Sequence, residues 1–119
     1  MVFGIGTDII EVKRIAESIC SESFIKRIFT ENEILYCNNK NVTKAQSYAA
    51  RFAAKEAFLK AYSPPYLGFK EIEILSRKNN KPYIRILKNK SSRELKNCFV
   101  SITHEQELAI AIVIILFDA

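Results

Sequence analysis

One long stretch, residues 43–62, constrains the fold most, because nothing in it interrupts helix formation. Thr43 and Gln46 have the spacing of a capping box at its start. The run Ser63-Pro64-Pro65 ends it, since proline cannot continue a helix. This stretch predicts the longest helix of the chain, and the segments around it must supply the surface on which it packs.

The N-terminal residues 2–10 predict a strand whose side chains alternate between two faces. One face carries Val2, Gly4, Gly6 and Asp8, and the other carries Phe3, Ile5, Thr7 and Ile9. The two glycines leave bare backbone beside Asp8, which permits close approach of a helix or a ligand.

Helical spacing then predicts short helices over residues 11–20, 22–29 and 31–37, the last opened by a capping box of Thr30 and Glu33. After the long helix, residues 71–75 and 82–87 predict a hairpin with its turn at Asn79-Asn80. Residues 91–97 predict a short helix or turn, and residues 98–103 and 108–117 a second hairpin with an apolar last strand. The order predicts an α+β fold, in which the long helix packs on a mostly antiparallel sheet, as a single domain over residues 1–119.

Composition limits the kinds of binding partner that the protein can have and the cellular compartment in which we expect it. The 18 basic and 13 acidic residues give a net charge of +5, which favours an anionic partner without choosing one. Three widely spaced cysteines suit neither a disulfide scaffold nor a zinc cage. No targeting segment is evident, and the apolar run 108–117 is half of what a membrane span needs. We therefore expect a cytoplasmic protein with no membrane contact.

Three side chains stand out as candidates for chemistry, each with a simpler interpretation beside it. Glu56 lies among alanines and aromatics of the long helix, one turn before Lys60, and the two could be only a surface pair. Asp8 ends an apolar strand and could instead cap the next helix. His104, the sole histidine, follows a strand and could serve only as a structural hydrogen-bonding residue.

Taken together, three segments resemble the signature segments of the holo-acyl-carrier-protein synthases, short members of the 4′-phosphopantetheinyl transferase superfamily. They are GIGTDIIEVKRI near the N-terminus, RFAAKEAFLKA in the long helix and SITHEQELAIAIVI near the C-terminus. KNNKPYIRIL is similar to the family's turn before a Lys-Pro strand. The resemblance covers essentially the whole chain, and the helical segment is its most specific part.

The resemblance implies an enzyme that moves 4′-phosphopantetheine from coenzyme A to a serine of an apo acyl carrier protein, in fatty acid biosynthesis. It also implies the 4′-phosphopantetheinyl transferase fold. Asp8 and Glu56 match the family's ligands for Mg²⁺, which prefers carboxylates, waters and substrate phosphates. Glu56 is then the candidate acceptor of the serine proton, and Lys60 a donor to phosphate oxygens.

Further residues match family positions around the coenzyme and the carrier protein. Arg51 and His104 are expected near coenzyme A, with its 3′-phosphate as their target, and Lys55 nearby, although it points about a quarter turn from Glu56. The family assembles as homotrimers with active sites at the subunit boundaries. The residues expected to dock the acidic carrier protein are Arg14, Phe24, Lys26 and Arg27.

Two departures from the family pattern limit the transfer of roles. The segment 62–68 is shorter and stiffer than the family's Gly-rich loop, so no coenzyme contacts are assigned to it. Glu105 stands where the family often has a small hydroxyl residue.

Two other functions stay open from sequence. One is a transferase acting on carrier domains of peptide or polyketide synthases, although such enzymes are usually about twice as long. The other is a nucleic-acid-binding module, which has only Tyr83 and Arg85 as an aromatic-basic pair on a strand. We expect no nucleic acid partner.

Overall fold

The computed structural model describes residues 2–62, 67–88 and 91–117. Its elements, in chain order, are β1 (Val2–Glu11), α1 (Val12–Ser18), α2 (Glu22–Ile28), α3 (Glu31–Asn38), the 3-10 turn η1 (Asn41–Thr43), α4 (Lys44–Ala61), the 3-10 turn η2 (Phe69–Glu71), β2 (Ile72–Ser76), β3 (Pro82–Lys88), β4 (Ser91–Glu94), β5 (Cys98–His104) and β6 (Leu108–Phe117). The predicted α+β fold is confirmed. The proline stop at residues 63–65 lies outside the described residues.

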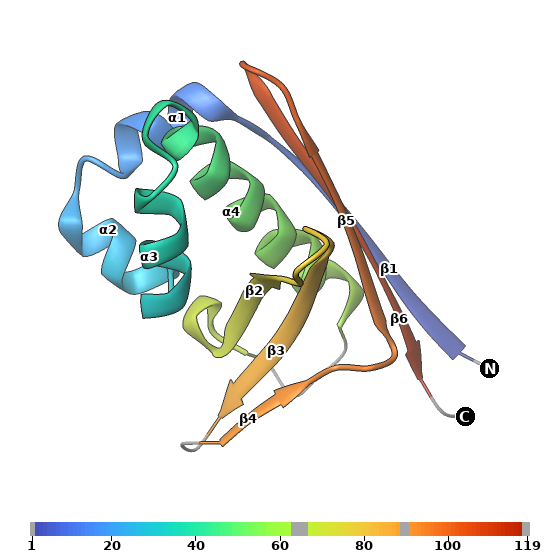
Figure 1. Cartoon of the computed structure of the whole chain (residues 1–119). Helices are drawn as coiled ribbons and strands as arrows, with labels where there is room; N and C mark the ends of the chain where they lie inside the picture. The colour runs from blue at the N-terminus through green and yellow to red at the C-terminus, as the bar shows by residue number, and fades with distance from the viewer. Residues whose placement is uncertain (1, 63–66, 89–90, 118–119) are drawn as a thin grey trace.

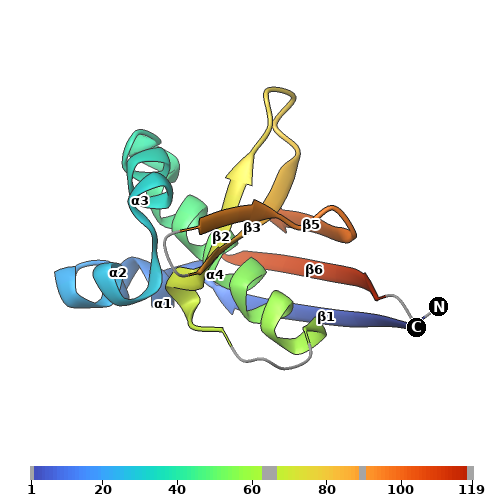
Figure 2. The same cartoon turned by 90° about the horizontal axis from the view of Figure 1, so that it is seen from below.

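The strands form two antiparallel sheets of three, in the orders β1-β6-β5 and β2-β3-β4. In the first, β6 is central as its apolar sequence predicted, and Asp8 pairs with Ala111. Figure 2 shows β2 and β3 standing at a steep angle to β1, β6 and β5.

Helix α4 is the central element, with α1, α2 and α3 on one side and the β1-β6-β5 sheet on the other (Figure 1). Its small residues make this possible, since Ala49, Ala53, Ala54 and Ala57 are completely buried. The opposite face of that sheet is covered by none of the described elements, and it exposes large apolar side chains: Phe3, Ile5, Ile9, Phe99, Ile110 and Ile112.

The two predicted capping boxes had different outcomes. The Thr30–Glu33 box is present, with the Thr30 hydroxyl accepting from the Glu33 N–H and Glu33 accepting from the Thr30 N–H. The box at Thr43 is wrong. A 3-10 turn leads directly into α4, so the Thr43 backbone (φ −98°, ψ 18°) is not in the extended conformation of a cap, and its hydroxyl donates to the Lys40 carbonyl instead.

The helix or turn predicted over residues 91–97 is also wrong in part, because residues 91–94 form strand β4. Its backbone pairs with β3, with Arg85 opposite Glu94. Side chains support this edge, since Glu94 accepts from Arg77 and Ser92 accepts from Arg85. Tertiary pairing here outweighs the weak strand propensity of the segment.

Candidate active site

Gly4 and Gly6 bring helix α4 unusually close to strand β1. A Cβ atom on Gly6 would lie 1.9 Å from the Ala57 carbonyl oxygen, and one on Gly4 would lie 2.0 Å from that of Ala61. No side chain fits at either position without moving the helix backbone. The glycines therefore set the distance between the strand that carries Asp8 and the helix that carries Glu56.

Asp8, Glu56 and Lys60 come together at this crossing of β1 and α4. The Lys60 ammonium donates to the Thr7 carbonyl at 2.9 Å and to the Asp8 carboxylate at 3.3 Å. Partial burial and the neighbouring Asp8 charge raise the pKa of Glu56, and Lys60 offsets only part of this rise. Two coupled carboxylates with one half-exposed lysine beside them form a site that would be stabilised by additional positive charge.

The donor set fits a magnesium ion shared with a substrate. Within the part of the chain that the structure describes, no group of three or more His, Cys, Asp and Glu side chains is placed to hold a metal. Mg²⁺ commonly binds through one or two carboxylates and completes its shell with waters and phosphate oxygens. Asp8 and Glu56 would hold it in that way, and phosphates would have to supply further oxygens.

Arg51 and His104 line a cavity of about 170 Å³, here called the Arg51–His104 cavity, which is separate from the carboxylate pair. Arg51 is buried, whereas His104 is exposed at the end of β5. Among the described residues, no acidic side chain lines this cavity, whose other lining residues are Tyr36, Ser47, Ala50, Ile74, Ser76, Asn80, Pro82 and Ile102. Its volume is below the roughly 300–1,000 Å³ of sites that enclose a drug-sized ligand, so it suits one anionic end of a larger molecule.

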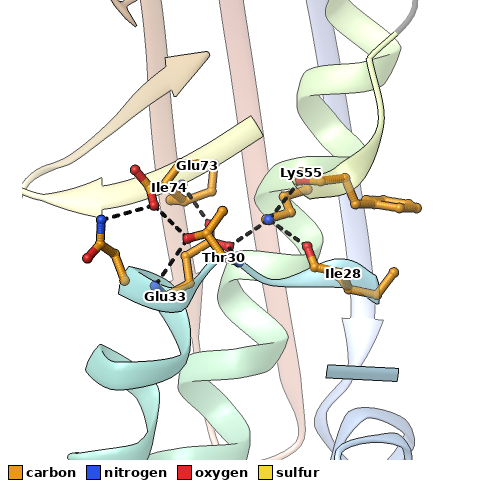
Figure 3. A network of polar contacts seen from close by, with 8 residues as sticks. Ile28, Thr30, Glu33, Lys55, Glu73 and Ile74 are labelled. Atoms are coloured by element: carbon orange, nitrogen blue, oxygen red, sulfur yellow. Dashed lines mark hydrogen bonds and ion pairs between the residues drawn. The ribbon is translucent and has the colours of Figure 1, made fainter. Parts of the chain in front are cut away.

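The coenzyme contact predicted for Lys55 does not fit the structure. Lys55 is fully buried, and its ammonium lies 2.6 Å from the Glu33 carboxylate. It also donates to the carbonyls of Ile28 at 2.7 Å and Phe69 at 2.9 Å, so all three N–H groups have partners (Figure 3). Because Lys55 lies 100° around the helix from Glu56, it faces the α2–α3 corner rather than the carboxylate pair.

Burial dominates this ion pair and disfavours both charges. It raises the pKa of Glu33 and lowers that of Lys55 more than their mutual attraction compensates. Glu33 also accepts from the Ile74 N–H at 2.7 Å, and the Thr30 hydroxyl donates to Glu73 at 2.6 Å. The network thus joins α3, α4, β2 and η2 (Figure 3), which is an architectural role.

The residues predicted to dock a carrier protein lie on or near the surface of α1 and α2. Arg14 and Arg27 are exposed. Lys26 is exposed too, but it pairs with Glu22 at 3.0 Å. Phe24 is only half-exposed, because its ring packs against Phe29 and Phe52 with centroids 6.2 Å away in each case. As an apolar contact it is therefore partly occupied within the protein.

Sequence reasoning missed most of the residues that line the Arg51–His104 cavity. Ser47 could have been found, since it lies one helical turn before Arg51 on the same face. Tyr36 and Ser76 come from α3 and β2, and no spacing in the sequence links them to α4.

Comparison with known proteins gives the family. Residues 4–113 match the model of the 4′-phosphopantetheinyl transferase superfamily. The chain belongs to this superfamily. A transferase of this superfamily from Halothermothrix orenii, named holo-[acyl-carrier-protein] synthase, is 40% identical over 96% of this chain and 97% of its own. The synthase of that name from Clostridium beijerinckii is 45% identical over 93% and 94%.

Solved structures of holo-[acyl-carrier-protein] synthases have the same fold as this transferase. The enzyme from Bacillus anthracis, in complex with CoA (3′,5′-ADP), superposes with a TM-score of 0.75 at 33% identity, covering 94% of each chain. The Helicobacter pylori enzyme, in complex with coenzyme A, gives 0.73 at 30% identity over 94% of this chain and 99% of its own. In the part of the transferase that the structure describes, no helix has the length and hydrophobicity needed to cross a membrane.

Proposed function

We propose that this protein transfers 4′-phosphopantetheine from coenzyme A to a serine of apo acyl carrier protein, in fatty acid biosynthesis in the cytoplasm. The products are holo acyl carrier protein and 3′,5′-ADP. The observation that carries the proposal is the meeting of Asp8, Glu56 and Lys60 at the β1–α4 crossing in a chain of this superfamily. Relatives that match over nearly their whole length are named for this reaction.

Magnesium is part of the proposal, with Asp8 and Glu56 as its protein ligands. When bound, Mg²⁺ would neutralise charge on the pyrophosphate of coenzyme A and on the departing 3′,5′-ADP. The remaining work falls to side chains of the protein. In this arrangement the half-exposed side chain of Lys60 would turn from Asp8 towards phosphate oxygens.

Glu56 is our candidate for the acceptor of the serine proton. The serine oxygen bonds to the β-phosphorus of coenzyme A, the bond from that phosphorus to the α-phosphate oxygen breaks, and the serine proton passes to the Glu56 carboxylate. The support for this role is the position of Glu56 beside Asp8 and Lys60 at the β1–α4 crossing, where the proposed metal and phosphates would meet the serine.

The Arg51–His104 cavity is proposed to take the 3′-phosphate of coenzyme A. The described residues of its lining include a buried guanidinium and no acid, which favours a dianionic group. This cavity and the carboxylate pair lie on different sides of α4, since residues 51 and 56 are separated by about 140° around the helix. One coenzyme molecule that reaches both kinds of site is most easily accommodated between two subunits.

We therefore propose a homotrimer with active sites at the subunit boundaries. The support is the uncovered face of the β1-β6-β5 sheet, where Phe3, Ile5 and Ile9 are each more than half exposed. Ile5→Glu should place a charge on this face and yield monomers without unfolding the chain, as measured by sedimentation equilibrium. A wild-type protein that stays monomeric at micromolar concentration would contradict the trimer.

Docking of the acidic carrier protein is assigned to Arg14 with Lys26 and Arg27, on α1 and α2. Their exposure supports the assignment, and opposite charge would speed the encounter. Phe24 is kept only as a partial apolar contact.

The test is to incubate the protein with apo acyl carrier protein, coenzyme A and Mg²⁺, and to weigh the carrier by mass spectrometry. We expect the mass gain of one phosphopantetheine and its loss when EDTA is added. Asp8→Ala and Glu56→Ala should abolish the gain while keeping the circular dichroism spectrum. Glu31→Ala, which removes an exposed acid from α3, is the matched control and should keep activity.

No gain with any of several carriers, including carrier domains of peptide and polyketide synthases, would refute the transferase reaction. A mass gain with those carrier domains alone would make them, rather than acyl carrier protein, the substrate of the transferase. Full activity in Asp8→Ala or Glu56→Ala would remove that residue from the site.

A further inference from the structure

Tyr36 of α3 and Arg51 of α4 form a stacked pair on the wall of the Arg51–His104 cavity. The central carbon of the Arg51 guanidinium lies 3.9 Å from the centroid of the Tyr36 ring, and both residues line the cavity. Arginine stacks readily on aromatic faces because its planar cation meets the negative face of the ring. Contact with the ring restricts how the guanidinium can turn, and so where its N–H groups point.

Other contacts hold Arg51 only weakly. Its Nη2 donates to the Ser76 hydroxyl at a long 3.4 Å, and its buried Nε has no hydrogen-bond partner among the described residues. None of the described carboxylates forms a salt bridge with it. A buried guanidinium without an anion has unused donor capacity, and besides the long Ser76 hydrogen bond the Tyr36 ring is the group that orients it.

The surroundings of Tyr36 add to the positive potential there. The exposed Lys40 ammonium lies 4.5 Å from the centroid of the same ring. Burial alone would raise the pKa of Tyr36, but the hydrogen bond with Ser76 and the charges of Arg51 and Lys40 outweigh it and lower that pKa. Two cations therefore share one ring beside a cavity that has no acid among the described residues of its lining.

We propose that Tyr36 is a positioning residue, whose ring holds the Arg51 guanidinium in the plane that grips the 3′-phosphate. Tyr36 thereby sets how strongly the enzyme prefers coenzyme A over 3′-dephospho-coenzyme A. This inference rests on the proposed function. It assigns to Tyr36 no contact with the reacting atoms, and it depends on the ring rather than on the hydroxyl.

The experiment compares kcat/KM for the two donors in the wild type, Tyr36→Leu and Tyr36→Phe. Because the cation–π contact is lost at a largely buried guanidinium, Tyr36→Leu should lower kcat/KM for coenzyme A by about tenfold, mainly through KM. For 3′-dephospho-coenzyme A the change should stay within about twofold. Tyr36→Phe keeps the ring and should keep the wild-type preference.

Tyr83→Leu is the matched control. The Tyr83 ring also carries a cation, with the Arg77 guanidinium 4.2 Å from its centroid, but it does not line the Arg51–His104 cavity. The same exchange there should leave the ratio between the two donors unchanged.

Each outcome has a defined meaning. An equal loss for both donors in Tyr36→Leu, or an unchanged ratio, would overturn the positioning role while leaving the transferase reaction intact. A wild type that uses neither donor would overturn the proposed function as well. If Tyr36→Leu does not fold, Tyr36→Gln takes its place, because the half-buried position on a helix tolerates a polar helix former.

A double-mutant test with Arg51 compares ratios between the two donors, so it does not depend on the absolute activity of the Tyr36 variant. Arg51→Lys keeps the charge but lacks the planar face, and it should lose the preference for coenzyme A by itself. Removing the Tyr36 ring in that background should then change the ratio no further. An additive effect of the two substitutions would show that Tyr36 does not act through Arg51.

Discussion

Gly6→Ala is the substitution whose effect follows most directly from the structure. The added Cβ would lie 1.9 Å from the Ala57 carbonyl oxygen and 2.9 Å from the Ala61 backbone nitrogen. Both are main-chain atoms of α4, so no side-chain rotation relieves the overlap. To restore an ordinary contact of about 3.4 Å, helix and strand would have to separate by about 1.5 Å.

This separation should lower both stability and activity. Overpacking by one methyl group costs about 1–3 kcal/mol, and we expect the upper end here because backbone must move. Such a loss corresponds to a fall in Tm of roughly 10–20 °C for a domain of this size. Asp8 and Glu56 flank the crossing, and a misplacement of about 1 Å can reduce a rate by about a hundredfold.

Thermal unfolding and the carrier-protein mass assay measure the two effects. Gly68→Ala is the control for stability, because its nearest neighbour would be the end of the Glu71 side chain at 3.6 Å and its φ of −80° suits alanine. It should change Tm little or raise it slightly. A Gly6→Ala protein with wild-type Tm and activity would refute the claim that this glycine sets the distance between β1 and α4.

The remaining predictions concern buried and half-buried charges. Lys55→Met leaves the buried Glu33 without its counter-charge. The free energy of unfolding, measured in urea, should fall by about 3–5 kcal/mol. A loss below about 1 kcal/mol would contradict a stabilising role for the network in Figure 3. The raised pKa of Glu56 in the metal-free protein predicts that Mg²⁺ binding weakens as pH drops through a value above the ordinary 4.5 of glutamate, since the carboxylate must be ionised to act as a ligand. Because the folded pKa is the higher one, Glu56 itself should favour the folded state below pH 4.5 and lose that contribution as pH rises through its folded pKa. Carboxyl ¹³C NMR of Asp8→Asn should show a lower Glu56 pKa, and an unchanged pKa would contradict electrostatic coupling of the two acids.

Sequence patterns predicted the structure correctly where the feature depended on a single strand or helix. The period of two placed Gly4, Gly6 and Asp8 on one face of β1, and burial follows that alternation. The two capping patterns show where such rules stop. The same spacing closes a box at Thr30 but not at Thr43, because the 3-10 turn before α4 removes the extended backbone that a cap requires.

The candidate site was also predictable only in part. Asp8, Glu56 and Lys60 were matched through the resemblance, yet only the packing of α4 against two glycines accounts for their meeting. The Arg51–His104 cavity draws its lining from α3, α4, β2, β3 and β5, so its composition depends on tertiary structure that no spacing in the sequence encodes.

The adjacent pair Lys55-Glu56 shows how one dipeptide serves both architecture and chemistry. A step of 100° sends Lys55 into the corner between α2 and α3, where Glu33 and two carbonyls engage its ammonium. The same step leaves Glu56 on the side of β1, next to Asp8. With Lys55 bound from three directions, α4 cannot rotate about its axis without breaking a buried ion pair. The buried lysine therefore fixes the direction of the half-exposed glutamate. Of two adjacent residues that both look like site residues, one is proposed to react and the other holds it in place.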